Sequence, residues 1–283
     1  MSRIATIGFF DGVHRGHRFL FAQLYEHAKH HQLTPTIYTF DRHPKELLTG
    51  QAPAMLTTHD ERKALLQNYG KVHFLDFAAV QHLTAEQFMC YLKEQEGVET
   101  LLMGYDHHFG SDCLKGFHEY EKIAHKVGLH VERAHECLVD GVPVSSSRIR
   151  KLFVAGQVQD ANRLLGYDYT MTGVVVHGNG IGTKIGFPTA NLQFQTEKLL
   201  PAIGVYAAKV QVDMEQYSAI VNIGNNPTIG NSQVSVEAHL IDFQMDLYGM
   251  SISVVFRNFI RPEQKFASLE ELQQQIKKDI QSI

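Results

Sequence analysis

The pattern of apolar residues changes near the middle of the chain, and this change constrains the fold more than any other feature. Up to about residue 165, short apolar runs alternate with longer stretches of helical periodicity. After Tyr167, strand-like runs follow one another with turn signals between them, and one helix closes the chain. Strands that alternate with helices predict a mostly parallel sheet, whereas successive strands predict an antiparallel barrel or sandwich. We therefore expect two domains, residues 1–166 and residues 167–283.

The periodicities also predict the individual elements. The last helix is expected to begin at a capping box formed by Ser268 and Glu271, and a turn is expected at 225–227. Strands are expected at 4–10, 35–40, 72–77, 100–103, 130–134, 170–177, 205–212, 218–223, 234–241 and 251–260, and helices at 16–30, 60–69, 85–95 and 120–127.

Composition sets the broad class of protein. The chain has 283 residues, with 26 Lys and Arg against 30 Asp and Glu, and a formal net charge of −4. This balance gives no electrostatic footprint for duplex nucleic acid. No run approaches about 18 consecutive apolar residues, so we expect no membrane span. The three cysteines lie far apart and do not suggest a disulfide framework. These features predict a soluble cytosolic protein and leave its oligomeric state open.

A glycine-rich run with two histidines follows the first expected strand. Residues 8–17 read G-F-F-D-G-V-H-R-G-H and lead into the first helix. At such a strand end, Gly8 and Gly16 would let the backbone approach a ligand, and free N–H groups at the helix start attract phosphate. His14 and His17 could donate hydrogen bonds to phosphate oxygens and stabilise charge on phosphorus. The alternative is a glycine-rich turn with two surface histidines, but this long a run at this position favours a phosphate site.

Two further runs of polar residues lie at expected strand ends or helix starts. Residues 104–110 read G-Y-D-H-H-F-G, where Asp106 could accept hydrogen bonds from ribose hydroxyls or an adenine amine, or could simply cap a turn. Residues 144–150 read V-S-S-S-R-I-R, and hydroxyls and amides at a helix start followed by Arg148 would form a phosphate clamp. Serine N-caps alone would look the same. The three runs together are more specific than any one of them.

The second half carries a candidate site of its own. Residues 186–191 read G-F-P-T-A-N after a glycine-rich stretch. The Thr189 hydroxyl and the Asn191 amide oxygen are hard ligands, suited to Mg²⁺ carried by nucleotide phosphates. Apolar residues at every second position of 234–241 place Glu237 on the opposite face, toward solvent or a pocket. For an isolated strand carboxylate, a solvated position is the more common outcome.

The chain contains 17 histidines, which raises the question of a metal site. His27, His30 and His31 are spaced so that they could share one face of a helix. No carboxylate or cysteine completes a site at a ligand-like spacing in the sequence. We therefore expect a solvated surface there.

The motifs of the first half resemble those of bacterial FAD synthetase modules. Residues 8–17 look like G-x-F-D-G-x-H-x-G-H, residues 104–110 are similar to G-x-D/N-F-x-F-G, and residues 144–150 to I-S-S-T-x-I-R. Residues 40–44, F-D-R-H-P, resemble the family's F-x-P-H-P.

The motifs of the second half resemble those of riboflavin kinases. Residues 186–191 match G-F-P-T-A-N, and residues 222–228 are similar to N-x-G-x-x-P-T. Residues 236–243 look like V-E-x-H-L-x-D-F, and the end of the chain, 261–279, also fits. The resemblance thus covers essentially the whole chain, in the order of the bacterial bifunctional riboflavin kinase/FAD synthetases.

The chain departs from these family patterns at a few positions. His107 stands where the family has Phe, and Ser147 where Thr is usual. Ile181 and Thr183 stand where many members have R-G-R, with Lys184 offering a positive charge nearby.

The resemblance implies an α/β fold, a Rossmann-like nucleotidyltransferase domain, followed by a small antiparallel β-barrel domain with a C-terminal helix. It implies that the barrel phosphorylates riboflavin with ATP and Mg²⁺ to give FMN. The first domain would transfer AMP from a second ATP to FMN, giving FAD and pyrophosphate. ATP, riboflavin, FMN and FAD are thus the expected substrates or products and Mg²⁺ the expected cofactor, while nucleic acid and membranes are not expected partners.

The resemblance also implies roles for residues of the first half. His14 and His17 would bind ATP phosphates and stabilise the transition state. Asp106 would orient the nucleotide, and Ser145 and Arg148 would hold the leaving pyrophosphate. The other residues expected to bind ATP or phosphate in this half are Gly8, Phe9, Asp11, Gly16 and Ser146.

In the second half, the resemblance makes Glu237 the base that takes the proton from the terminal ribityl hydroxyl of the flavin. Thr189 and Asn191 would position Mg²⁺, and Gly186 and Pro188 would contact the nucleotide.

Two other functions stay open at the level of sequence. The barrel could be a non-catalytic, flavin-binding regulatory module on an adenylyltransferase, although intact Thr189, Asn191 and Glu237 argue against this. The chain could instead be a flavin-responsive interaction or nucleic-acid-binding protein, which its acidic balance disfavours.

Overall fold

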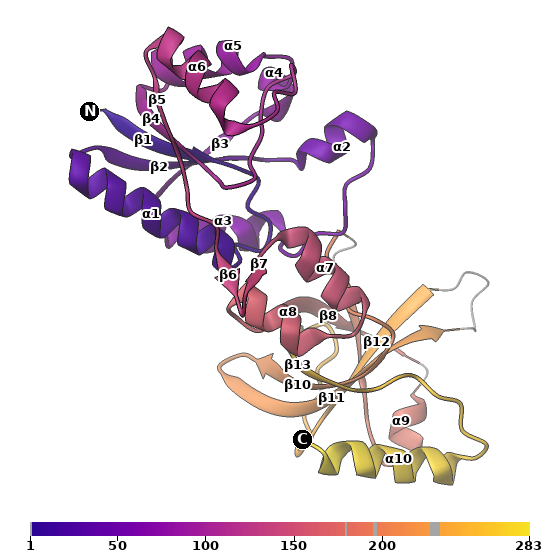
Figure 1. The fold of residues 1–283 in the computed structure, drawn as a ribbon. Helices are drawn as coiled ribbons and strands as arrows, with labels where there is room; N and C mark the ends of the chain where they lie inside the picture. Colours follow the sequence, from indigo (N-terminus) through magenta and orange to yellow (C-terminus); the bar gives the residue numbers. More distant parts are fainter. Residues whose placement is uncertain (1, 179, 195–196, 227–232) are drawn as a thin grey trace. The chain divides into compact units, whose positions relative to one another are not determined.

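The structure, a computed structural model, divides into two compact units, Met1–Ser146 and Ser147–Ile283. The first is a parallel α/β sheet and the second an antiparallel barrel, so the change of pattern in the sequence marks a real change of architecture (Figure 1). The compact units divide after Ser146, so the helices at 146–154 and 158–165 fall almost entirely in the second unit. The expected boundary near residue 166, as a boundary between domains that fold separately, stays a prediction. The residues that the structure describes are 2–178, 180–194, 197–226 and 233–283.

The sheet of the first unit has the strand order β3-β2-β1-β4-β5, with every neighbouring pair parallel. The chain runs outward from β1 through β2 and β3, then returns to β4 on the other side of β1. The loops after β1 and β4 therefore meet where the strand order reverses, which is where open α/β sheets bind their ligands. In chain order the elements are β1 (Arg3–Ile7), α1 (Arg15–His31), β2 (Thr34–Phe40), α2 (Pro44–Thr49), α3 (His59–Gln67), β3 (Lys71–Leu75), α4 (Phe77–Val80), α5 (Ala85–Glu94), β4 (Val98–Met103), α6 (Phe117–Val127), β5 (His130–Arg133), β6 (Leu138–Val139) and β7 (Val142–Pro143).

Helices cover both faces of this sheet (Figure 1). Ile4 of β1 packs in a core with residues of α1 and α3, whereas Ala5 and Ile7 pack in a second core with residues of α5 and α6. This division follows the alternation of side chains along a strand. Thr58 and Thr84 begin α3 and α5 with reciprocal capping boxes, which explains why these helices start where they do.

The second unit is built on a closed barrel with the strand order β10-β11-β12-β9-β8-β13, in which every paired neighbour is antiparallel. The sequence pattern predicted these strands except β9, which pairs with β12 through only two residue pairs and has little periodicity of its own. The elements are α7 (Ser146–Val154), α8 (Val158–Leu165), β8 (Thr170–Val176), α9 (Ile181–Lys184), β9 (Ala190–Phe194), β10 (Gly204–Val212), β11 (Glu215–Asn226), β12 (Gln233–Leu240), β13 (Ser251–Arg261) and α10 (Leu269–Gln281).

Helices α7 and α8 pack on the barrel. The ring of Phe153, in α7, is buried 4.3 Å from the ring of Tyr169, measured between centroids. Asn162, in α8, donates to the carbonyl of Phe256 (2.9 Å) and accepts from the N–H of Tyr169 (3.0 Å). These buried contacts make the two helices part of the barrel's core.

The C-terminal helix is fixed at both ends. Ser268 accepts from the N–H of Glu271 (3.3 Å), as the predicted capping box requires, but the Glu271 carboxylate accepts from the N–H of Ala267 (3.0 Å). Near the other end, buried Asp279 forms a bidentate pair with Arg261 of β13 at 3.0 and 2.8 Å. Along the described parts of the chain, no helix has the length and apolar character needed to cross a membrane.

Candidate active sites

The loop after β1 holds two apolar residues in the left-handed region of backbone conformation. Phe10 has φ 59° and Val13 has φ 35°, and the N–H of Val13 donates to the carbonyl of Phe10 (3.1 Å). Both side chains are buried in the core beside α1. Residues without a glycine's freedom adopt this conformation at a cost, so the surrounding core must hold the loop in place. The core beside α1 therefore holds this loop in one conformation before any ligand binds.

His14 and His17 lie side by side at the start of α1. His14 is the N-cap residue and is 3% exposed, and its Nδ1 accepts from the N–H of His17 (3.3 Å). In the neutral ring this leaves the proton on Nε2. The two rings stack with centroids 3.5 Å apart. Burial, and secondarily the neighbouring His14, holds the pKa of His17 well below its ordinary value of 6.5.

The Nδ1 atom of His17 is buried and has no hydrogen-bond partner among the described residues. Buried polar atoms are nearly always paired, so an unpaired one at a strand-end loop and a helix start indicates a place for a ligand atom. A neutral imidazole beside a second imidazole is suited to receive an anionic oxygen. This is the strongest local sign of a phosphate site in the first unit.

Asp11 makes its contacts within the protein. The residue is 2% exposed, and its Oδ1 accepts from both the N–H and the hydroxyl of Thr57, each at 3.0 Å. Both of its carboxylate oxygens lie within 3.1 Å of the N–H of Leu56. The N–H of Gly12 in turn donates to the Thr57 hydroxyl (3.1 Å). Asp11 thus ties the loop after β1 to the segment that precedes α3.

Arg62 of α3 is a buried charge that no motif of the sequence singles out. It is 1% exposed, and it donates to the carbonyls of Phe9 and Phe40 at 2.8 Å and to the hydroxyl of Thr39 at 2.9 Å. Its guanidinium lies 3.9 Å from the centroid of the Phe9 ring. Burial lowers the pKa of Arg62 to about 10, so the group stays charged at neutral pH. The ends of β1 and β2 are therefore held by a positive charge close to the loop.

The run 104–110 forms a turn after β4. Asp106 is exposed in this turn, which is closed by the N–H of His107 donating to the carbonyl of Gly104 (3.1 Å). Burial lowers the pKa of His107 to about 4, so its ring is neutral at pH 7 and packs 6.0 Å from the ring of Phe109. At the position where the family has Phe, this chain thus carries a half-buried, uncharged ring.

The run 144–150 begins beside the first loop. The hydroxyl of Ser146 donates to the carbonyl of Asp11 (2.9 Å). A Cβ on Gly16 would lie 3.2 Å from the carbonyl oxygen of Val144, closer than side chains normally approach, so a glycine permits these segments to meet. The structure thereby brings two of the sequence motifs together.

The remaining candidates of this half are Gly8, Ser145 and Arg148. The N–H of Gly8 donates to the carbonyl of Tyr38 (3.1 Å), which continues the β1–β2 ladder beyond β1. Ser145 is half-buried just before α7. Arg148 is exposed in the first turn of α7 and belongs to the second compact unit.

In the second unit, Glu237 of β12 lies between two asparagines of neighbouring strands. It pairs with Asn191 of β9 and with Asn222 of β11, and directly opposed residues share one face of a sheet. Val236 and Ala238 are buried in the barrel, so Glu237 points away from the barrel core, as the alternation predicts.

The carboxylate of Glu237 is half-buried and faces Thr189. Its Oε2 accepts from the Thr189 hydroxyl at 3.4 Å. Burial raises the pKa of Glu237 above its ordinary value of 4.5, and the hydrogen bond from Thr189 offsets part of that rise. Glu237 is thus a stronger base than a solvated carboxylate, and it lies beside a hydroxyl group and an amide.

Glycines of the stretch after β8 approach these polar residues closely. A Cβ on Gly178 would lie 1.9 Å from the side-chain nitrogen of Asn191, so any other residue there would force Asn191 to move. The N–H of Phe187 donates to the carbonyl of Gly182 (2.8 Å), and Thr183 is exposed. The side chains of Ile181 and Lys184, and all of Pro227 and Thr228, lie outside the described residues, so the expectations about them stay predictions.

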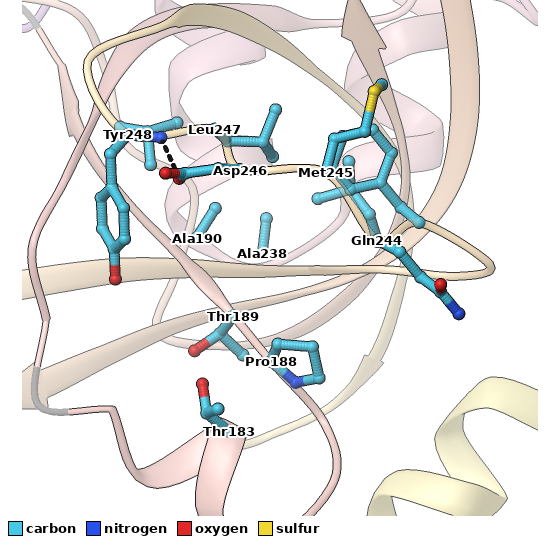
Figure 2. Close-up of a pocket in the computed structure, with 13 residues that line it drawn as sticks. Thr183, Pro188, Thr189, Ala190, Ala238, Gln244, Met245, Asp246, Leu247 and Tyr248 are labelled. Carbon is cyan, nitrogen blue, oxygen red and sulfur yellow. Dashed lines mark hydrogen bonds between the residues drawn. The ribbon is translucent and has the colours of Figure 1, made fainter.

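A cavity of about 200 Å³ adjoins this cluster (Figure 2). The hydroxyls of Thr183 and Thr189 face one another at its edge, and the ring of Tyr248 stacks on His177 with centroids 4.1 Å apart. The N–H of Gly186 donates to the carbonyl of Thr183 (3.2 Å). Apolar walls with a few hydroxyl groups are typical of pockets that bind small molecules. The other lining residues are Val175, Pro188, Ala190, Ala238, Leu240, Phe243, Gln244, Met245, Asp246 and Leu247.

Comparison with known families matches both halves of the chain. A sequence model of the FAD synthetase family matches residues 1–148, and one of the riboflavin kinase family matches residues 165–283. The bifunctional riboflavin kinase/FMN adenylyltransferase of Pseudomonas fluorescens is 36% identical over 282 residues, covering 98% of this chain and 90% of the relative. The protein of the same name from Escherichia coli strain K12 is 37% identical over 285 residues, with the same coverages.

One solved structure matches over nearly the whole chain. The crystal structure of a protein from Streptococcus pneumoniae, named there as a macrolide-efflux protein, is similar with a TM-score of 0.89 and 30% sequence identity. The match covers 99% of this chain and 93% of that one. The predicted fold, a nucleotidyltransferase-like parallel sheet followed by an antiparallel barrel and a C-terminal helix, is confirmed.

Proposed function

Because the chain belongs to the family of bifunctional riboflavin kinase/FMN adenylyltransferases, we propose that it catalyses both reactions. The second unit phosphorylates riboflavin with ATP to give FMN, and the first unit adenylylates FMN with a second ATP to give FAD. The observation that carries the proposal is that each unit gathers its own polar motif residues around one place. These are His14, His17 and Ser146 in the first unit, and Thr189, Asn191 and Glu237 in the second.

In the kinase reaction, Glu237 is the general base. It takes the proton of the terminal ribityl hydroxyl, the freed oxygen attacks the γ-phosphorus of ATP, and ADP leaves with the electrons of the broken P–O bond. Its raised pKa supports this role, because a base works best when its pKa lies nearer the operating pH.

The residues around Glu237 fit Mg²⁺, the ion that the sequence motifs lead us to expect with ATP. The Thr189 hydroxyl and the Asn191 amide oxygen are hard donors, and Asn191 lies opposite Glu237 on the same face of the sheet. These two side chains would hold the ion, and Mg²⁺ when bound neutralises the charge of the phosphates.

In the adenylyltransferase reaction, His14 and His17 bind the phosphates of ATP. An oxygen of the FMN phosphate attacks the α-phosphorus, and pyrophosphate leaves; the attacking phosphate is already ionised, so no base is needed. Binding of the polyanion favours the protonated imidazole, so the pKa of His17 rises when ATP binds. Asp106 orients the nucleotide, and Ser145 and Arg148 hold the pyrophosphate.

Asp11 acts in this proposal as a positioning residue. Its carboxylate is occupied by the N–H groups of Leu56 and Thr57, and its own carbonyl receives the hydroxyl of Ser146. It therefore fixes the loop that presents His14, and the expected direct contact of Asp11 with phosphate is the weaker interpretation.

Chromatography of products tests the proposed function. The purified protein is incubated with riboflavin, ATP and Mg²⁺, and flavins are separated over time. We expect FMN to appear first and FAD to follow as FMN declines. FMN alone would show that the first unit is inactive. No product from riboflavin, with FAD formed from supplied FMN, would favour the flavin-binding regulatory barrel.

A further inference from the structure

Two histidines and a glutamate meet on the first unit, outside the residues assigned to either reaction. His27 and His31 lie one turn apart on α1, and Glu132 lies on β5, the edge strand of the sheet. One ligand atom from each of these three residues lies within 4.8 Å of the others. The sequence showed the helical histidines but no carboxylate beside them, because Glu132 is brought there only by the fold. The expectation of a solvated histidine surface is therefore incomplete.

The carboxylate of Glu132 is held in a fixed orientation. Its Oε2 lies 2.5 Å from Nδ1 of His27, and its Oε1 lies 3.2 Å from Nε2 of His130 on the same strand. The Glu132 side chain is 20% exposed, which limits its freedom further. A carboxylate oriented by a neighbouring imidazole is the arrangement that commonly surrounds metal ligands in proteins.

The two elements are also fixed relative to each other. Gln23, one turn before His27 on α1, accepts from the backbone N–H of His135 (2.8 Å), just beyond β5. This hydrogen bond fixes α1 against the segment that follows β5, and so fixes the elements that carry the histidines and Glu132. A site of this kind needs only side-chain rotation to close on an ion.

We propose that His27, His31 and Glu132 bind a divalent transition-metal ion of the Zn²⁺ class. Two imidazoles at i and i+4 with one carboxylate form a common ligand set for Zn²⁺, and imidazole ligands disfavour Mg²⁺ and Ca²⁺. Tetrahedral bonds of about 2.1 Å separate neighbouring ligand atoms by about 3.4 Å. Rotation of the exposed His31 side chain can bring its ligand atom to this distance, and the His27 and Glu132 ligand atoms, which lie 2.5 Å apart, must separate to admit the ion. Water completes the coordination, and His130 orients Glu132. The ion would link the end of α1 to the edge strand of the sheet.

Titration calorimetry of the full-length protein with ZnCl₂, without nucleotide or flavin, tests this proposal. His31→Ala removes one ligand and leaves the contact between His27 and Glu132 in place. Glu132→Gln weakens the third ligand at constant size. The matched control is His30→Ala, which removes an exposed histidine of the same helix that is not part of the cluster.

We expect one Zn²⁺ ion per chain bound at this site, with affinity reduced about 10- to 100-fold or more in His31→Ala and Glu132→Gln and unchanged in His30→Ala. Excess Zn²⁺ should raise the melting temperature of the wild-type protein by roughly 5 °C and that of His31→Ala much less. Equal binding by the wild type and His31→Ala, or no saturable binding by the folded wild type, would refute the proposal. When MgCl₂ replaces ZnCl₂, the wild type and His31→Ala should give the same titration signal.

Discussion

The substitution Glu237→Gln separates a catalytic carboxylate from a structural one. Glutamine keeps the size of the side chain, and its amide oxygen can still accept from Thr189, whose hydroxyl lies 3.4 Å from the carboxylate. What is lost is the basic oxygen. A positioned general base contributes roughly 100- to 10,000-fold to rate, which corresponds to about 2.7–5.4 kcal/mol of activation free energy. We expect riboflavin phosphorylation to fall by a factor in this range.

Folding of the variant should be unimpaired. Burial raises the pKa of Glu237, so the ionised form is less favourable in the folded barrel than in the unfolded chain. For a carboxyl group of this kind, stability is greatest below its unfolded pKa and declines as the pH rises through its folded pKa. At neutral pH the neutral glutamine should therefore leave the melting temperature equal to or above that of the wild type, and this difference should diminish toward acidic pH.

Two assays on one purified variant decide the role of Glu237. Starting from riboflavin, FMN formation should collapse, and starting from FMN, FAD formation should continue at the wild-type rate. The wild-type kinase should gain activity as the pH rises through an apparent pKa above 4.5, since the base must be ionised. Glu215→Gln, at an exposed carboxylate of β11, is the matched control and should keep both activities. Near wild-type phosphorylation by Glu237→Gln would refute the assignment of Glu237 as the base.

The contacts described above lead to three further predictions. His17→Ala should reduce FAD formation from FMN by about 100-fold or more, because a donor to phosphate is lost, while FMN formation in the same preparation stays unchanged; equal loss of both activities would indicate a folding defect. Asp11→Asn should lower the free energy of unfolding of the first unit by about 2 kcal/mol or more, because at least one buried N–H of 56–57 loses its acceptor; an unchanged urea midpoint would show that the carboxylate is not a structural tie. A fragment 147–283 should fold and make FMN and should melt at a higher temperature than a fragment 167–283, because α7 and α8 bury apolar side chains on the barrel; equal melting temperatures would place the boundary near residue 166.

Local pattern was enough to predict most of the architecture. The alternation of apolar residues predicts the strands of the sheet and most strands of the barrel, because each buries one or both faces at a fixed period. It does not predict β9, because this short strand has little periodicity of its own and forms by pairing with β8 and β12. A helix start was expected at residues 144–150, where α7 begins, but the extent of α7 and the whole of α8 were not predicted, because both are determined by packing against the barrel, as the contact of Phe153 with Tyr169 illustrates.

Nonlocal contacts account for what the sequence could not reveal in the sites. Arg62 reaches the strand-end carbonyls of Phe9 and Phe40 from a helix whose sequence gives no sign of this role. Asp11 belongs to a phosphate-type motif, yet its carboxylate meets the N–H groups of a segment far along the chain. Glu132 joins the histidines of α1 only in the folded structure. In each case the residue type is visible in the sequence, but its partner is not.

Mixing two variants tests most directly whether one chain carries two sites with separate catalytic residues. Glu237→Gln alone, given riboflavin, ATP and Mg²⁺, should form little FMN or FAD, and His17→Ala alone should accumulate FMN. An equimolar mixture of the two purified variants should convert riboflavin to FAD, because FMN released by His17→Ala is adenylylated by Glu237→Gln. We predict FAD in the mixture at a rate limited by FMN release. A mixture that accumulates FMN and forms no more FAD than the single variants, although Glu237→Gln adenylylates supplied FMN, would contradict exchange between independent sites.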